Sequence, residues 1–134
     1  MDMIINFEKG KKVNATYKNT LIKTDQPVKA GGEGSAPEPF SLFLASIGTC
    51  AGIYVKSFCD QRGIPSDDIR LVQSMKFNPE KRMIDSINID IQLPADFPEK
   101  YREAVIKAAD LCTVKKHLAD PPGIEVRALT ASRV

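Results

Sequence analysis

The chain has 134 residues, of which 43% are hydrophobic and 27% are charged, and its formal net charge is +2. This length fits a single domain over residues 1–134, and the balanced charge argues against a nucleic-acid or anionic-membrane partner. No apolar stretch approaches the ~18 residues that span a bilayer, and the first residues lack the features of a signal peptide, so we expect a cytoplasmic protein with reduced cysteines.

The N-terminal residues alternate between polar and apolar side chains over 4–8 and again over 12–17. This period of two, with Gly10 between the runs, predicts a β-hairpin whose basic turn lies in solvent. A third strand is expected over 21–24, and the turn residues at 25–27 end it.

A loop rich in glycine and proline (30–39) leads into the strongest periodic signal of the chain. Apolar residues recur at spacings of three and four, which predicts one apolar face of an α-helix over 39–62. Pro39 suits the first turn of this helix, and Gly63 suits its end. The apolar face consists of Phe40, Phe43, Leu44, Ile47, Ala51, Tyr54, Val55 and Phe58.

The second half of the chain predicts two more strands, over 69–77 and 83–93, the second with clean alternation. A second helix is expected from 98 to about 119, where the segment 120–123 breaks it. A final strand is expected over 124–130. The resulting order, β-β-β-α-β-β-α-β, is typical of an α+β fold with largely antiparallel sheets.

Cys50 borders the apolar face of the long helix, so it is either a small core residue or a functional thiol. Gly48, Ala51 and Gly52 favour the second interpretation, because small neighbours let another backbone or a substrate approach closely. Cys59 lies half a turn out of phase with Cys50 on a straight helix, which indicates a structural residue.

Cys112 also has two interpretations. If the second helix breaks near Leu111, Cys112 begins a new short helix, where free backbone N–H groups, Lys115 and Lys116 favour its thiolate. If the helix is continuous, Cys112 is an ordinary core residue. His117, the only histidine, is expected at the surface. The cysteine spacing gives no CxxC and no zinc-ligand pattern, so we expect neither a metal nor another cofactor.

Two segments are more specific together than apart. The glycine- and proline-rich loop leads into Phe-Ser-Leu-Phe-Leu-Ala-Ser-Ile-Gly-Thr-Cys, which ends at Cys50, and Leu-Cys-Thr-Val-Lys-Lys-His-Leu follows at 111–118. With the order of elements, these segments resemble the OsmC-like family. The resemblance implies an intertwined homodimer with buried central helices and active sites at the subunit interface. It also implies a peroxidatic Cys50 that a hydroperoxide oxidises, a resolving Cys112, and a dithiol reductant that resets the pair.

The chain departs from the family pattern at the groups that support the thiol. Ser41 stands where the family usually has glutamate, with Glu38 nearby, and no arginine occurs before the loop. Lys29 or Lys23 supplies charge there, but not the bidentate fork of arginine. Thr113 follows the second cysteine, where proline is usual.

Three hypotheses follow from this pattern. The first is a thiol-dependent reductase of organic hydroperoxides, of weak activity where its supporting groups are missing. The second is a non-peroxidatic ligand-binding or redox-sensing protein on the same dimeric scaffold. The third is a structural module in which all three cysteines fill the core.

Overall fold

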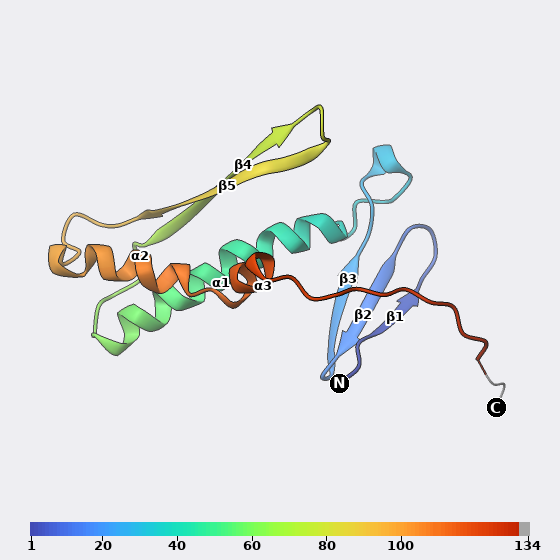
Figure 1. Ribbon diagram of the computed structural model, residues 1–134, viewed down its shortest axis with the longest axis horizontal. Helices are drawn as coiled ribbons and strands as arrows, with labels where there is room; N and C mark the ends of the chain where they lie inside the picture. Colours follow the sequence, from blue (N-terminus) through green and yellow to red (C-terminus); the bar gives the residue numbers. More distant parts are fainter. Residues whose placement is uncertain (132–134) are drawn as a thin grey trace. The chain divides into compact units, whose positions relative to one another are not determined.

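The computed structural model describes residues 1–131 (Figure 1). These residues contain two antiparallel sheets and three α-helices, so the predicted α+β class is confirmed. The chain divides into two compact units. The first unit comprises Met1–Thr49 and Arg70–Gln92, and the second begins with Cys50–Ile69 and continues from Leu93.

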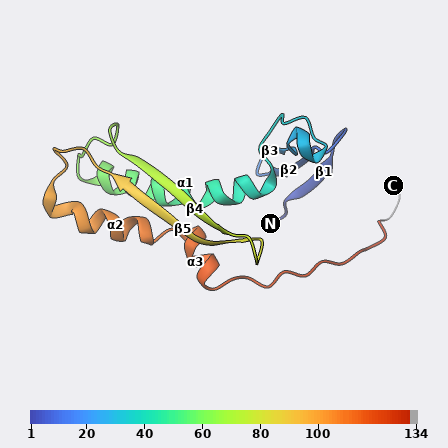
Figure 2. The ribbon, with the colours of Figure 1, turned by 90° about the horizontal axis from the view of Figure 1, so that it is seen from above.

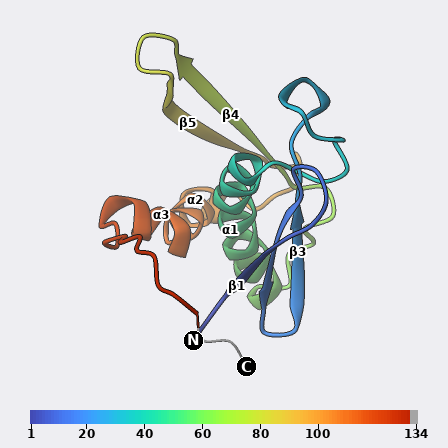
Figure 3. The same ribbon diagram turned by 90° about the vertical axis from the view of Figure 1, so that its right-hand side faces the viewer.

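The first unit opens with a three-stranded sheet, as the alternating pattern predicts. Strands β1 (Ile4–Phe7), β2 (Val13–Tyr17) and β3 (Thr20–Thr24) pair antiparallel in chain order, and they run side by side in Figure 3. Asn14 lies in the centre of this sheet, opposite Asn6 on one side and Lys23 on the other. Because directly opposed residues share a face, Asn14 and Lys23 project to the same side.

The predicted strands of the second half are also confirmed. Strands β4 (Arg70–Asn78) and β5 (Met83–Gln92) form a long, twisted antiparallel ribbon with a bulge between Lys76 and Phe77 (Figure 2). The side chain of Asn78 accepts hydrogen bonds from two backbone N–H groups of the turn that follows, which closes the hairpin.

The long predicted helix is α1 (Pro39–Gln61). Its predicted apolar face is buried at Ile47, Ala51, Val55 and Phe58, whereas the phenylalanines of its first turns remain exposed. The expectation that no segment is long enough to span a membrane is wrong, because α1 passes that test by length and composition. Glycine, alanine, serine and threonine residues separate the large apolar side chains of α1, but the mean hydropathy of the helix stays high.

Within the first unit, α1 approaches β4 closely at Gly48. The Nε2 group of Gln73 donates to the Leu44 carbonyl over 3.0 Å. A Cβ atom on Gly48 would lie 2.4 Å from Oε1 of the same glutamine. The absence of a side chain at Gly48 therefore makes room for the Gln73 amide.

The single helix predicted over 98–119 is instead interrupted. A 3₁₀ turn, η2 (Glu99–Tyr101), leads into α2 (Arg102–Asp110), and a separate helix α3 (Thr113–Ala119) follows (Figure 1). Cys112 has a non-helical backbone (φ −49°, ψ 127°) and caps α3, its Sγ accepting the Lys115 N–H over 3.4 Å. This cap satisfies one free donor of the new helix, which explains why the chain restarts there.

The strand predicted over 124–130 is not formed within the described residues, which corrects the predicted order at its last element. A strand exists only where its backbone groups pair with a neighbouring strand, and no ladder forms over this segment in the described chain. Its apolar side chains are exposed, with Ile124 at 85% and Val126 at 94%.

Candidate functional site

The second unit brings Cys50 and Cys112 together. Cys50 lies half-buried on α1, and Cys112 lies 2% exposed at the start of α3. The two thiols share a hydrogen bond that lowers the pKa of Cys50 and raises the pKa of Cys112. The fold therefore joins two cysteines that are far apart in the sequence.

The first turn of α3 favours the thiolate of Cys50. The backbone N–H of Val114 makes the largest contribution to lowering the Cys50 pKa, and the Cys112 thiol and the Thr113 N–H act in the same direction against the effect of burial. The first N–H groups of a helix have no partner within it, so they are free to donate to a sulfur anion. Cys50 is thus the thiol of the pair that ionises more readily.

The same surroundings favour the protonated form of Cys112. Burial raises its pKa, and its hydrogen bond to Cys50 acts in the same direction, whereas the Lys115 N–H opposes them. For a helix that breaks near Leu111, the sequence predicts that the helix start and the lysine charges favour the Cys112 thiolate. Burial outweighs the helix start here, and the Lys115 ammonium is paired with Asp110. The helix start serves Cys50 instead.

Thr113, at the start of α3, contacts α1, and the sequence alone does not predict this contact. Its hydroxyl lies 3.1 Å from the Tyr54 hydroxyl, and its backbone N–H lowers the Cys50 pKa. A proline at this position would have no N–H to offer. The departure from the family pattern at Thr113 therefore supplies the thiol with an additional donor, and the only signal in the sequence was the departure itself.

Two further side chains with reactive groups, Cys59 and His117, do not belong to this pair. Cys59 is fully buried, and burial raises its pKa, which agrees with its predicted structural role. His117 is exposed, as predicted, with Nδ1 2.7 Å from the Thr113 carbonyl oxygen. Within residues 1–131, no group of three or more histidine, cysteine, aspartate or glutamate side chains is arranged to hold a metal ion.

The predicted supporting residues belong to the first unit. Ser41 is exposed in the first turn of α1, nine positions before Cys50 and therefore on the opposite side of that helix. Glu38 is exposed just before the helix, and Lys29 is exposed in the 3₁₀ turn η1 (Val28–Ala30). The groups that act on Cys50 in its own unit come from residues 112–114.

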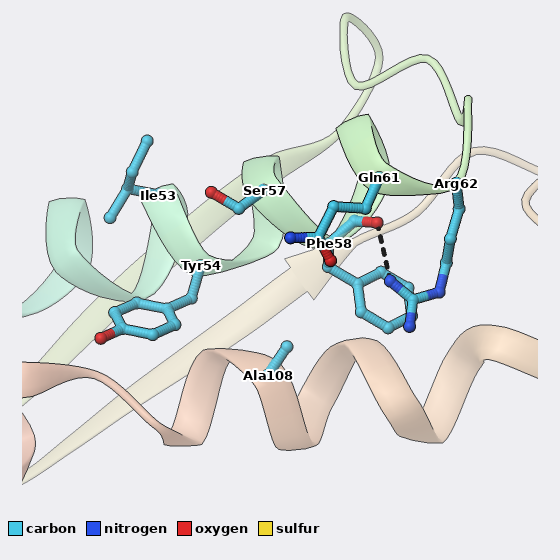
Figure 4. A pocket seen from close by; sticks show the side chains of 7 residues that line it. All are labelled: Ile53, Tyr54, Ser57, Phe58, Gln61, Arg62 and Ala108. Atoms are coloured by element: carbon cyan, nitrogen blue, oxygen red, sulfur yellow. Dashed lines mark hydrogen bonds between the residues drawn. The ribbon is translucent and has the colours of Figure 1, made fainter.

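A pocket of about 450 Å³ lies beside Tyr54 in the second unit (Figure 4). The Arg62 guanidinium lies 3.7 Å from the ring centroid of Phe58 and donates to the Phe58 carbonyl over 3.0 Å. Tyr54, which lines this pocket, also contacts Thr113 at the start of α3. The lining residues are Ile53, Tyr54, Ser57, Phe58, Gln61, Arg62 and Ala108.

Comparison with known proteins places this geometry in context. Residues 32–127 match the family model described as OsmC-like protein. No curated protein matches the sequence.

Among solved structures, a protein of Psychrobacter arcticus superposes with a TM-score of 0.70 at 20% identity, over 85% of each chain. An OsmC-like protein of Mycoplasma pneumoniae has a TM-score of 0.68 at 13% identity, over 90% of this chain and 87% of its own. An organic hydroperoxide resistance protein, OsmC, of Legionella pneumophila has a TM-score of 0.53 at 21% identity, over 88% and 89%. At these identities the likeness establishes the fold.

Proposed function

Because the chain belongs to the OsmC-like family, we propose that it reduces organic hydroperoxides through the thiol pair Cys50 and Cys112. The observation that carries this proposal is the contact between the two thiols, with a lowered pKa at Cys50 and a raised pKa at Cys112. A nucleophilic thiolate beside a protonated thiol is the arrangement that a two-cysteine peroxide reductase needs.

The reaction has three balanced steps. The Cys50 thiolate attacks the terminal oxygen of the hydroperoxide, the O–O bond breaks and Cys50 becomes a sulfenic acid, while the departing alkoxide takes a proton from water and leaves as the alcohol. The Cys112 sulfur then attacks the Cys50 sulfur, a disulfide forms, and water leaves. A dithiol reductant returns both cysteines to thiols and is itself oxidised to a disulfide.

The pocket beside Tyr54 supports an organic rather than an inorganic peroxide. Its wall includes the side chains of Ile53, Phe58 and Ala108, which favour an apolar substituent because burying it releases water from apolar surface. Since Tyr54 contacts Thr113, a substituent in this pocket lies on the same side of α1 as the start of α3.

Consumption of cumene hydroperoxide in the presence of dithiothreitol tests the proposal. We expect Cys50→Ser to abolish turnover, and Cys112→Ser to slow it, because the Cys50 sulfenic acid must then react with dithiothreitol directly instead of forming the internal disulfide. Cys59→Ser is the matched control and should turn over at the rate of the wild type, since the buried Cys59 takes no part. Equal rates in all four proteins would overturn the proposal.

A second function, redox sensing without turnover, is favoured by one observation. Within the described residues, the groups that shift the Cys50 pKa include no cation, so its activation is weaker than a paired arginine would give. In that case mild hydroperoxide forms the disulfide between Cys50 and Cys112, detectable by mass spectrometry, but repeated turnover with a dithiol is negligible.

We further propose that the working form is a cytoplasmic homodimer, in which residues 1–134 form one domain and α1 is a core helix rather than a membrane span. Within one chain, Ser41 lies on the opposite side of α1 from Cys50. In the proposed dimer, Ser41, Glu38 and Lys29 of one copy approach the Cys50 thiol of the other copy. The exposed apolar side chains of the N-terminal sheet and of residues 124–129 support this assembly.

A further inference from the structure

Two hydroxyl groups meet beside the thiol pair, and the reaction proposed above does not use them. The Tyr54 hydroxyl on α1 and the Thr113 hydroxyl at the start of α3 lie 3.1 Å apart, and either can be the donor. Both residues belong to the second unit, as do Cys50 and Cys112. Thr113 is exposed and Tyr54 is half-buried, so a small substrate and water can reach this contact.

Tyr54 lies on the same face of α1 as Cys50. The two residues are four positions apart within this helix, and side chains at that spacing are neighbours one turn apart. Figure 4 shows the Tyr54 ring on the side of α1 that faces Ala108 of α2, and the ring lines the pocket there. Tyr54 is therefore both a wall of the pocket and a neighbour of the reactive thiol.

Thr113 reaches Cys50 through its backbone. Its N–H donates to the Cys50 sulfur, which helps to lower the pKa of that thiol. In a threonine only Cα and Cβ separate the backbone nitrogen from Oγ1, so these two atoms lie within about 4 Å of each other. A hydroperoxide whose terminal oxygen meets the Cys50 sulfur can therefore place its second oxygen against the Thr113 hydroxyl.

This pair of hydroxyl groups holds one more proton than its own contact uses. Each hydroxyl carries one proton, and a single hydrogen bond between them employs one of the two. A phenol is more acidic than an alcohol, so Tyr54 is the better donor and Thr113 the better acceptor. The Thr113 O–H is then left to donate elsewhere, and it becomes a stronger donor because hydrogen bonds in a chain polarise one another.

The proposed reaction needs a donor at this place. As the O–O bond breaks, negative charge develops on the oxygen that leaves with the organic group. Within the described residues, the groups that act on Cys50 include no cation that could stabilise this charge. A hydrogen bond aimed at the leaving oxygen strengthens as the charge grows, so it stabilises the transition state more than the bound substrate.

We infer that the Thr113 hydroxyl donates a hydrogen bond to the leaving oxygen of the hydroperoxide, and that Tyr54 orients and polarises this donor. The inference rests on the proposed reduction of hydroperoxides by Cys50. The hydrogen bond stabilises the alkoxide as the O–O bond breaks, water then protonates the alkoxide, and Thr113 keeps its own proton. Thr113 is thus a catalytic residue of this step, and Tyr54 is a positioning residue.

Rapid-quench oxidation of the full-length protein by cumene hydroperoxide tests the role of Thr113. Mass spectrometry follows the loss of the free Cys50 thiol in a single turnover, at a pH above the Cys50 pKa of each protein. Thr113→Val keeps the backbone N–H and the side-chain shape but loses the donor, so oxidation should slow about fivefold or more. Thr113→Ser keeps a hydroxyl and should stay within about twofold of the wild-type rate.

Tyr54→Phe tests the positioning role, because it keeps the ring in the pocket wall and removes only the hydroxyl. The Thr113 donor remains but is less well oriented, so oxidation should slow by a smaller factor, about twofold to threefold. Thr20→Val makes the same change as Thr113→Val at an exposed threonine of β3. It is the matched control and should be oxidised at the wild-type rate.

Alkylation of Cys50 by iodoacetamide separates catalysis from packing. Iodide leaves in that reaction, so no donor to an oxygen is needed, and Thr113→Val and Tyr54→Phe should be alkylated as fast as the wild type. If Thr113→Val slows alkylation as much as oxidation, the Thr113 hydroxyl acts through packing and the inference is wrong. Circular dichroism of each variant checks that it is folded.

The remaining outcomes distinguish this inference from the proposed function. A wild type whose Cys50 is not oxidised by the hydroperoxide would overturn both. Where wild-type Cys50 is oxidised, the inference alone would be overturned by equal oxidation rates in Thr113→Val and the wild type. A Thr113→Ser protein as slow as Thr113→Val would overturn it as well, because the hydroxyl would then not be the group that matters.

Discussion

Cys50 and Cys112 begin with the same intrinsic chemistry, and only their surroundings distinguish them. Cys50 is half-buried and receives N–H groups from the first turn of α3, whereas Cys112 is almost fully buried. Opposite pKa shifts on neighbouring groups are how proteins assign different roles to identical side chains. In the proposed reaction, these shifts suit Cys50 on α1 to the role of nucleophile and Cys112 at the helix cap to the role of resolving thiol.

Replacing Thr113 tests the origin of this asymmetry at the scale of one residue. Thr113→Pro removes an N–H that reaches Cys50, so the Cys50 pKa should rise and peroxide attack at neutral pH should slow several-fold. Proline is tolerated at the first position of a helix, so α3 should still form. A pH titration of thiolate ultraviolet absorbance measures the pKa.

Thr113→Val is the matched control for this change. It keeps the backbone N–H and loses only the hydroxyl contact with Tyr54, so the Cys50 pKa should stay close to that of the wild type. A Thr113→Pro protein with an unshifted Cys50 pKa would show that this N–H does not stabilise the thiolate. A shift of equal size in both variants would assign the effect to the Tyr54 contact instead.

At the scale of elements, the packing of α1 against β4 depends on one glycine. Gly48 is unfavourable within a helix by about 1 kcal/mol relative to alanine. In return, the Gln73 side chain lies where a Cβ atom would be and donates to the Leu44 carbonyl. A hydrogen bond of this kind contributes about 1 kcal/mol to stability. The two effects are of similar size and opposite sign.

A double-mutant cycle separates the helix propensity of residue 48 from the contribution of the Gln73 hydrogen bond. Gly48→Ala alone should be nearly neutral, because the gain in helix propensity is offset when the flexible Gln73 side chain is displaced. In a Gln73→Ala background the clash is gone, so the same substitution should stabilise the protein by about 1 kcal/mol. Urea unfolding measures both values, and equal effects of Gly48→Ala in the two backgrounds would refute the coupling.

At the scale of the whole molecule, apolar surface remains uncovered in the single chain. Ile5 and Phe7 are 52% and 83% exposed on one face of the N-terminal sheet, opposite to the face that carries Asn14. Residues 124–129 carry further exposed apolar side chains in an extended segment. Exposed apolar surface of this kind marks an interface, and the proposed homodimer accounts for both features.

Val126→Asp tests the assembly. A charge buried without a partner at an apolar interface is costly, so the variant should dimerise at least tenfold more weakly than the wild type. Arg127→Asp places the same side chain one position later, on the other side of an extended segment, and should weaken dimerisation less. Sedimentation equilibrium measures the dissociation constants, and a wild type that stays monomeric, or a Val126→Asp variant that dimerises normally, would contradict the prediction.

The sequence by itself determined the elements whose signals are local. Spacings of three and four predicted α1, alternation predicted the two hairpins, and the segments around Cys50 and Cys112 identified the family, because side-chain periodicity follows directly from backbone geometry. Only the tertiary structure decided which cysteine has its pKa lowered, since the N–H groups at 113 and 114 reach Cys50 only after α3 packs against α1. Tertiary structure also decided that residues 124–130 form no strand within the described chain. A strand depends on a neighbouring strand, which its own residues do not specify.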